Sequence, residues 1–176
     1  ADHVIQDVEA FHQAINIASS QAQDGKLATF GIVPTDANTG YGYIKASKGD
    51  VGGVHKVEEF VEKPDLQTAK SYLEQGGYLW NSGMFMFQAD VLIDELTTHS
   101  PGIVASVNNA INDAKQDLDF IRLDKQAFES SPSDSIDCAL MEKSDNVVVI
   151  PLNAHWNDIG SWSALYDIGI KDDNGN

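Results

Sequence analysis

Short apolar runs alternate with amphipathic segments along the chain, and this alternation predicts an α/β fold. Strands are expected at residues 27–33, 41–46, 54–62, 80–87 and 147–152, where apolar or aromatic runs lie between turn residues. Because helical segments separate most of these runs, we predict a mixed, mostly parallel sheet.

The helices are predicted from spacing and from capping residues. Apolar side chains recur at helical spacing from residue 4 to residue 15, and Gly25 ends this first helix. The other predicted helices follow the cap at Asp65, begin at Asp90 and at Pro101, and cover residues 133–143 and 161–168.

A glycine-rich loop for nucleotide phosphates is missing from this pattern. Such a loop joins a strand to a helix, whereas Gly52 and Gly53 lie between two predicted strands and favour a hairpin. There is also no initiator methionine, so we expect the chain to begin inside a longer protein.

Composition narrows the classes of partner. The chain has 27 acidic and 11 basic residues, a net charge of −16, which argues against nucleic acid and anionic membranes. An anionic small substrate would need a local lysine or metal ion. Apolar residues make up 42% of the chain, and no apolar run approaches the roughly 18 residues of a membrane span. Cys138 is the single cysteine, which suits a reducing compartment such as the cytoplasm.

Residues 58–64 form the first candidate segment. Glu62 and Lys63 end a predicted strand that leads directly into a helix, and ligands of α/β proteins bind beyond the carboxyl ends of strands. Glu62 can accept hydrogen bonds from sugar hydroxyls, and Lys63 can meet a phosphate as a point charge. The alternative is a solvated charge pair in front of a helix.

Two further segments carry polar or small residues in apolar surroundings. Asn81, Ser82 and Gly83 interrupt an aromatic strand, where buried polar groups need partners. A strand bulge with Asn81 bonded to the backbone explains them equally well. Gly42 alternates with tyrosines at a strand start and can expose backbone donors to a ligand, or it can serve a simple turn.

Asp158 is the candidate metal ligand. It follows a predicted buried strand, where a carboxylate is well placed for Mg²⁺, a cation that takes one or two protein carboxylates plus substrate phosphates. The alternative is that Asp158 caps the helix near Ser161. Asp2 could be a second ligand, with an equally plausible role as a helix cap.

Taken together and in order, these segments resemble the mannose-1-phosphate guanylyltransferase family, particularly the bacterial type often fused to a phosphomannose isomerase domain. The matching strings are ADHVI, FGIVPT, TGYGYI, VEEFVEKPD, YLWNSGMF, PSDSID, MEK and WNDIGSWSAL, and they span nearly the whole chain. The combination of FVEKP, WNSGMF and DIGSW at these separations is specific.

The resemblance implies a Rossmann-like nucleotidyltransferase fold and the synthesis of GDP-mannose and pyrophosphate from GTP and mannose 1-phosphate. It implies that Asp2 and Asp158 hold Mg²⁺ and that Lys63 and Asp158 are catalytic. It also implies sugar-phosphate binding by a set of five residues: Gly42, Glu62, Lys63, Asn81 and Ser82. Asp137 matches a motif near the sugar site, with no role assigned.

The chain also departs from the family pattern. It lacks the N-terminal part with the nucleotide loop, so we expect a sheet that is incomplete on its N-terminal side and a chain that is inactive alone. Residues 1–170 are expected to be the central and C-terminal part of a nucleotidyltransferase domain of the GT-A-like type, with residues 171–176 a linker or boundary, and a homodimer is possible. The alternatives are a related sugar-1-phosphate uridylyltransferase or thymidylyltransferase, or a non-catalytic sugar-nucleotide-binding relative.

Overall fold

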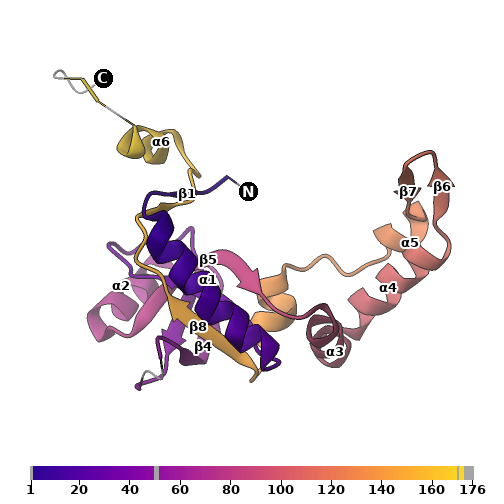
Figure 1. The fold of residues 1–176 in the computed structure, drawn as a ribbon, viewed down its shortest axis with the longest axis horizontal. Coiled ribbons are helices and arrows are strands. Elements are labelled where there is room, and N and C mark those ends of the chain that lie inside the picture. The colour runs from indigo at the N-terminus through magenta and orange to yellow at the C-terminus, as the bar shows by residue number, and fades with distance from the viewer. Residues whose placement is uncertain (1, 50–51, 170, 173–176) are drawn as a thin grey trace.

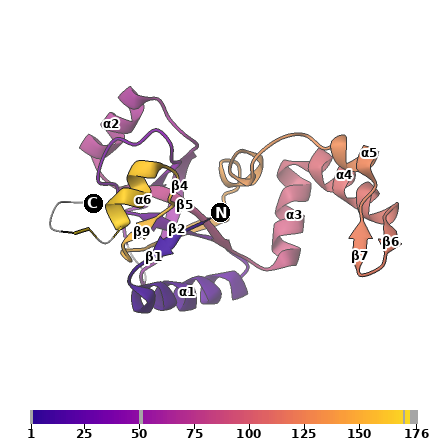
Figure 2. The same cartoon turned by 90° about the horizontal axis from the view of Figure 1, so that it is seen from above.

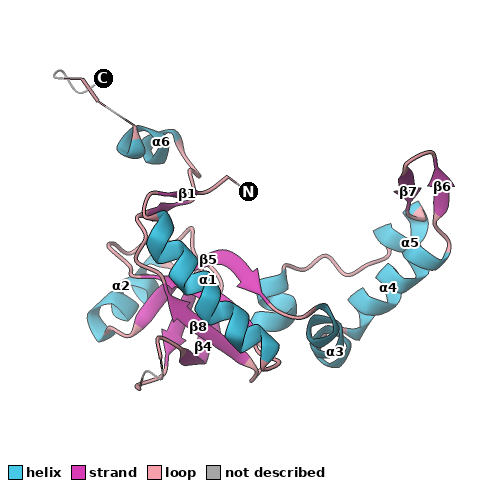
Figure 3. Ribbon diagram, in the orientation of Figure 1, coloured by secondary structure: helices cyan, strands magenta, loops and turns pink. Residues whose placement is uncertain are grey.

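Five strands pair into a closed ring in this computed structural model, which describes residues 2–49, 52–169 and 171–172. Helix α1 (Val8–Gln23) lies across these strands (Figures 1 and 3). The strands are β2 (Leu27–Ile32), β3 (Tyr43–Ala46), β4 (His55–Val61), β5 (Tyr78–Met86) and β8 (Val147–Pro151). They pair in the order β2-β5-β3-β4-β8, and β8 pairs with β2 in turn. Each of these five strands therefore has two partners, so the described part of this ring does not show the incomplete sheet that we expected.

The prediction of a mostly parallel sheet is wrong, although the sheet is mixed. Only β2 and β8 run parallel among the described pairs of this ring, and the other four pairs are antiparallel. The helix α2 (Leu66–Gln75) does connect two strands of the same direction, β4 and β5, as a crossover should. However, β3 lies between them and runs opposite to both.

The predicted helix boundaries are partly right. Helix α1 (Val8–Gln23) begins after Asp7, whose carboxylate accepts a hydrogen bond from the Ala10 backbone at 3.0 Å. The residues before it form β1 (Val4–Ile5), which pairs with β9 (Trp156–Asn157), a strand that we did not predict. Helix α2 has the predicted cap at Asp65 and ends at Gly76, whose φ is +66°.

Residues 89–129 form an arm that projects from the sheet (Figures 1 and 2). It contains α3 (Ala89–His99), α4 (Pro101–Asn112), β6 (Lys115–Asp117), β7 (Phe120–Arg122) and α5 (Lys125–Glu129). The last three were not predicted, and α3 is preceded by Gln88 as its cap, so Asp90 is not the cap. The arm holds none of the predicted site residues.

The helix predicted at residues 133–143 is shorter and of another kind. It is the π-helix η1 (Asp137–Met141), which buries Ala139, Leu140 and Met141. The last helix, α6 (Trp162–Ile168), agrees with the prediction.

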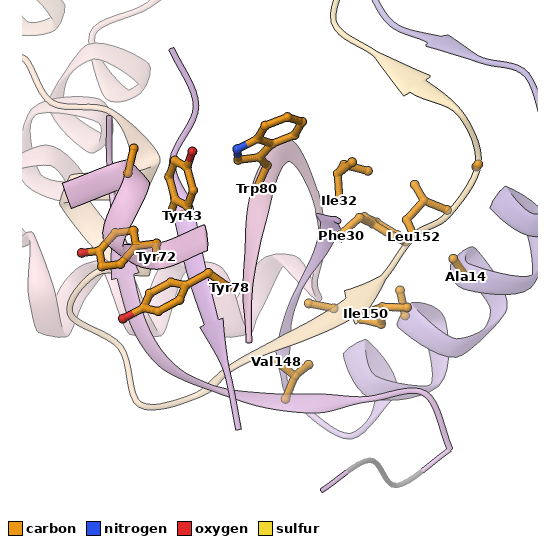
Figure 4. Close-up of a cluster of buried hydrophobic side chains, with 14 residues drawn as sticks. Ala14, Phe30, Ile32, Tyr43, Tyr72, Tyr78, Trp80, Val148, Ile150 and Leu152 are labelled. Atoms are coloured by element: carbon orange, nitrogen blue, oxygen red, sulfur yellow. The ribbon is translucent and has the colours of Figure 1, made fainter. Parts of the chain in front are cut away.

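Buried side chains form two clusters that share the strands. One packs α1 and α2 against the strands and contains Phe30, Tyr43, Tyr72 and Trp80 (Figure 4). The other joins the strands to η1 through Leu140 and related apolar residues. No helix among the described residues is long and apolar enough to cross a membrane. The predicted boundary segment 171–176 lies mostly outside the described residues.

Candidate active site

A cavity of about 740 Å³ lies where β2 and β8 end and where β9 and α6 begin, a volume within the usual range for small-molecule sites. Asn38, Tyr41, Trp80, Trp156 and Asp158 are among the residues that line it. The segments before and after Asp158 therefore line the cavity. This agrees with the expectation that a ligand would bind near a carboxylate that follows a buried strand.

The carboxylate of Asp158 is turned toward Tyr41 and does not cap α6. Ser161 is the cap, because its hydroxyl accepts a hydrogen bond from the Ala164 backbone at 3.1 Å. Asp158 Oδ1 accepts hydrogen bonds from the Tyr41 hydroxyl at 2.8 Å and from the Gly160 backbone at 3.3 Å. The other oxygen, Oδ2, accepts none from any described residue, so it can take a ligand.

Tyr41 is held in its neutral form beside this carboxylate. Burial raises the pKa of the Tyr41 phenol well above its usual value of 10, and the hydrogen bond to Asp158 and the charges of Asp158 and Asp36 raise it further. Its ring also packs against Trp80 and Trp156, with centroids 5.0 and 5.5 Å away. Tyr41 is therefore a fixed hydrogen-bond donor that orients Asp158.

A second group of predicted residues surrounds Gly42, the next residue along the chain. A Cβ atom at Gly42 would lie 2.7 Å from Glu62 Oε2 and 3.4 Å from the Asn81 Cβ. Only glycine leaves room for Glu62 to approach this closely. Lys63 makes an ion pair with Glu62 at 3.2 Å, and its side chain is 62% exposed against 19% for Glu62.

Asn81 and Ser82 are buried, and their side chains bond within the protein. Asn81 is 8% exposed, accepts a hydrogen bond from the Gly83 backbone at 3.2 Å and donates to Asp137 at 3.0 Å. The Ser82 hydroxyl accepts from the Met84 backbone at 3.3 Å. Both residues thus hold the shape of β5, and direct contact of either with a substrate stays a prediction.

The structure therefore divides the predicted site residues between two neighbouring groups. Asp158 lines the cavity, whereas Gly42, Glu62, Lys63 and Asn81 gather beside it. Tyr41 and Gly42 join the groups, because adjacent Cα atoms lie about 3.8 Å apart. Trp80 and Asn81 join them again, and the Asn81 backbone donates to the Gly42 carbonyl at 2.8 Å.

Asp2 is exposed and lies two residues before the paired strand β1. The pairing of Val4 with Asn157, continued in register, brings the segment around Asp2 next to the segment around Asp158. Asp7 caps α1, so Asp2 does not. No cluster of three or more metal-binding side chains occurs among the described residues, and a pair of carboxylates fits Mg²⁺, which keeps waters and substrate phosphates as its other ligands.

Backbone strain is concentrated at the same places. Among the described residues other than glycine, positive φ occurs at Lys63 (45°), His155 (49°), Ile159 (49°) and Leu118 (53°). The first three belong to or adjoin the two groups. Such conformations cost of order 1–3 kcal/mol each and are found preferentially at functional sites.

Two features of the cavity were missed by reasoning from sequence. Tyr41 lies 117 residues from Asp158 along the chain, so no local pattern connects them. Trp80 is 6% exposed, and its indole Nε1 has no hydrogen-bond partner among the described residues. Figure 4 shows this ring beside Tyr43. A buried donor without a partner is costly and leaves a contact available for a water or ligand.

Comparisons with known proteins identify the family of this chain. The sequence profile described as nucleotidyl transferase matches residues 1–175. The xanthan biosynthesis protein XanB of Xanthomonas campestris pv. campestris is 54% identical over all 176 residues, and a protein of Salmonella muenchen named mannose-1-phosphate guanylyltransferase is 54% identical over 172 residues. The chain spans 37% and 36% of the lengths of these relatives.

A solved structure gives the same result for the fold. A protein of Thermus thermophilus, named mannose-1-phosphate geranyltransferase, superposes with a TM-score of 0.82 at 30% identity. The match covers 97% of this chain and 48% of that one. Together with the profile match over nearly the whole length, these similarities show that the chain belongs to the nucleotidyl transferase family.

Proposed function

We propose that the intact protein containing residues 1–176 transfers a guanylyl group from GTP to mannose 1-phosphate, releasing pyrophosphate and forming GDP-mannose. The observation that carries the proposal is the 54% identity, over 98% of the chain, to a protein named mannose-1-phosphate guanylyltransferase. The position of Asp158 in the cavity, oriented by Tyr41 and free at Oδ2, agrees with it.

The roles of the residues follow from where charge is needed. Both substrates are anions, so the reaction depends on positioning and on neutralising charge, without a nucleophilic side chain. Lys63 would contact the sugar phosphate, and Glu62 would accept hydrogen bonds from the sugar hydroxyls. Gly42 would leave the space that Glu62 needs, and Asn81 and Ser82 would support the strand behind them.

Asp158 and Asp2 would hold Mg²⁺. The ion would supply positive charge next to the phosphates. Tyr41 would keep the Asp158 carboxylate in place through its hydrogen bond, and Ser161 leaves that carboxylate free by capping α6. In this proposal Lys63 and Asp158 are the catalytic residues.

Three further points belong to the same proposal. The domain would share the Rossmann-like arrangement of the family. The reaction would take place in the cytoplasm, which the single cysteine supports. Two copies would associate, and light scattering of the intact protein tests this.

The direct test is pyrophosphate release by the intact protein with GTP, mannose 1-phosphate and Mg²⁺, with UTP and dTTP as competing nucleotides and glucose 1-phosphate as a competing sugar. We expect turnover with GTP and mannose 1-phosphate to exceed the other pairings. Faster turnover with UTP or dTTP would contradict the proposal.

A further inference from the structure

The amide of Asn81 has an orientation that the surrounding donors fix. The Gly83 backbone N–H reaches the side chain at 3.2 Å and can only donate, so the atom facing it must be the oxygen. The NH₂ group of Asn81 then faces Asp137 Oδ1 at 3.0 Å. A buried amide thus holds a carboxylate that lies 56 residues away in sequence.

Asp137 begins a short helix that is anchored in the core by buried side chains. It is the first residue of the π-helix η1, whose last three residues, Ala139, Leu140 and Met141, are at most 2% exposed. π-Helices are rare and occur often at functional sites. The residue that ends this helix, Glu142, accepts a hydrogen bond from the Glu62 backbone at 3.0 Å. One short segment therefore contacts both Asn81 on β5 and Glu62, the residue that follows β4.

Only one of the two oxygens of the Asp137 carboxylate accepts a hydrogen bond from a described residue. Its Oδ1 takes the bond from Asn81, while its Oδ2 accepts no hydrogen bond and meets no cation among the described residues. A partly buried carboxylate without a positive partner does not stabilise the fold by charge pairing. The bond from Asn81 therefore fixes the direction of an acceptor that remains available.

Asn81 links this carboxylate to the space at Gly42. That space is bordered by Glu62 Oε2 and by the Cβ of Asn81, and Asp137 is attached to the same Asn81 side chain. Carboxylates accept hydrogen bonds and cannot donate them, and hydroxyl groups are the donors that a sugar offers.

We propose that Asp137 accepts a hydrogen bond from a hydroxyl group of the bound sugar phosphate, and that Asn81 is the positioning residue that aims it. The inference rests on the proposed function, because it names the sugar phosphate as the ligand. It also gives Asn81 a role that does not require contact with the substrate.

The test uses Asp137→Asn in the intact protein, with Asp134→Asn as the matched control. The asparagine can still accept from Asn81 through its oxygen, so the fold is kept, but its outer atom becomes a donor. We expect the KM for mannose 1-phosphate to rise about 10- to 100-fold, as for a lost hydrogen bond to a charged group. The KM for GTP should stay within about twofold, and Asp134→Asn should change neither value.

Deoxy analogues separate direct contact from a structural effect. The 2-, 3-, 4- and 6-deoxy forms of mannose 1-phosphate are compared in the wild type and in Asp137→Asn. We expect one analogue to bind more weakly to the wild type and to lose nothing further in the variant, because the partner is already gone. Asn81→Ala, where it folds, should show the same pattern, and combined with Asp137→Asn it should add little.

The outcomes are distinguishable. The role of Asp137 would be overturned if every deoxy analogue bound as much more weakly to Asp137→Asn as it does to the wild type. An unchanged KM for mannose 1-phosphate in Asp137→Asn would overturn it too. Turnover with glucose 1-phosphate in place of mannose 1-phosphate would sink the proposed function, and the same variant and analogue series on that sugar would then judge Asp137. A wild-type protein that binds no hexose 1-phosphate would overturn both.

Discussion

Replacing Gly42 with alanine should separate the function of the proposed sugar-phosphate site from the stability of the fold. The new Cβ would lie 2.7 Å from Glu62 Oε2, and an ordinary contact requires 3.4 Å or more. The carboxylate must therefore move by about 0.7 Å. Functional groups need to be held within roughly 0.5 Å of their productive position, and a shift of about 1 Å can cost 100-fold in rate. We expect kcat/KM for mannose 1-phosphate to fall by about tenfold or more.

The same change should cost little stability. The atom that must move is the end of a flexible side chain, and the next contacts, at 3.4 and 3.5 Å, are within ordinary range. We expect the free energy of unfolding to change by less than about 1 kcal/mol. Gly31→Ala is the contrasting variant, because its Cβ would lie 2.6–2.9 Å from atoms of the partly buried Leu79 and the buried Val149. Overpacking of this kind typically costs about 1–3 kcal/mol.

The assay is steady-state kinetics of the intact protein, with urea unfolding of each variant alongside. A third variant, Gly169→Ala, controls for the general effect of removing a glycine, since its φ is −69° and its Cβ would meet only ordinary contacts at 3.4 and 3.5 Å. If Gly42→Ala keeps the wild-type kcat/KM while its stability is unchanged, Glu62 does not contact the substrate. The second group of site residues would then lie outside the active site.

The remaining predictions concern charge. Asp158→Asn should lower kcat more than it raises the KM for sugar phosphate, and high Mg²⁺ should restore part of the activity. Lys63→Ala should raise that KM about 10- to 100-fold, and Mg²⁺ should not restore it. Both variants are measured across a Mg²⁺ titration, and a near-normal kcat of Asp158→Asn at limiting Mg²⁺ would contradict the role of Asp158 as a metal ligand. Burial raises the pKa of Tyr78 to about 12, helped by its hydrogen bond to Glu59, so its stabilising contribution is complete below about pH 10 and is lost as the pH rises toward 12. Urea unfolding between pH 8 and 12 should show a smaller decline for Tyr78→Phe than for the wild type, and equal declines would contradict this account.

The sequence predicted the central strands because burial on both sides leaves a clear signal. Residues 27–32 and 147–150 are buried throughout and appear in the sequence as continuous apolar runs. Strand direction left no such signal, since the position of β3 between β4 and β5 depends on pairing across the sheet. The hairpin of β6 and β7 was missed because its residues are exposed and show no apolar alternation.

The sequence predicted which residues belong to the candidate site, but it did not predict the contacts between their side chains. Motif positions singled out Glu62, Lys63, Asn81 and Asp158, because polar residues at the ends of predicted strands, or inside an aromatic strand, are unusual enough to be noticed; their roles stay predictions. The bonds that organise them join Tyr41 to Asp158 and Asn81 to Asp137, over 117 and 56 residues. Neither pairing has a local spacing, so the contacts of these side chains required the fold.

The structure excludes one of the two roles considered for Asp158, that of cap for α6. Ser161 has the extended backbone of a helix cap, with φ −150° and ψ 162°, and its hydroxyl accepts from Ala164. Ile159, at φ 49°, turns the chain in between, so that Asp158 faces Tyr41. We therefore expect Ser161→Ala to cost about 1 kcal/mol of stability, and Asp158→Asn to cost clearly less, because the neutral amide oxygen still accepts from Tyr41. Thermal unfolding of both variants measures this, and a larger loss for Asp158→Asn would mean that the carboxylate holds the helix and is not free for a metal ion.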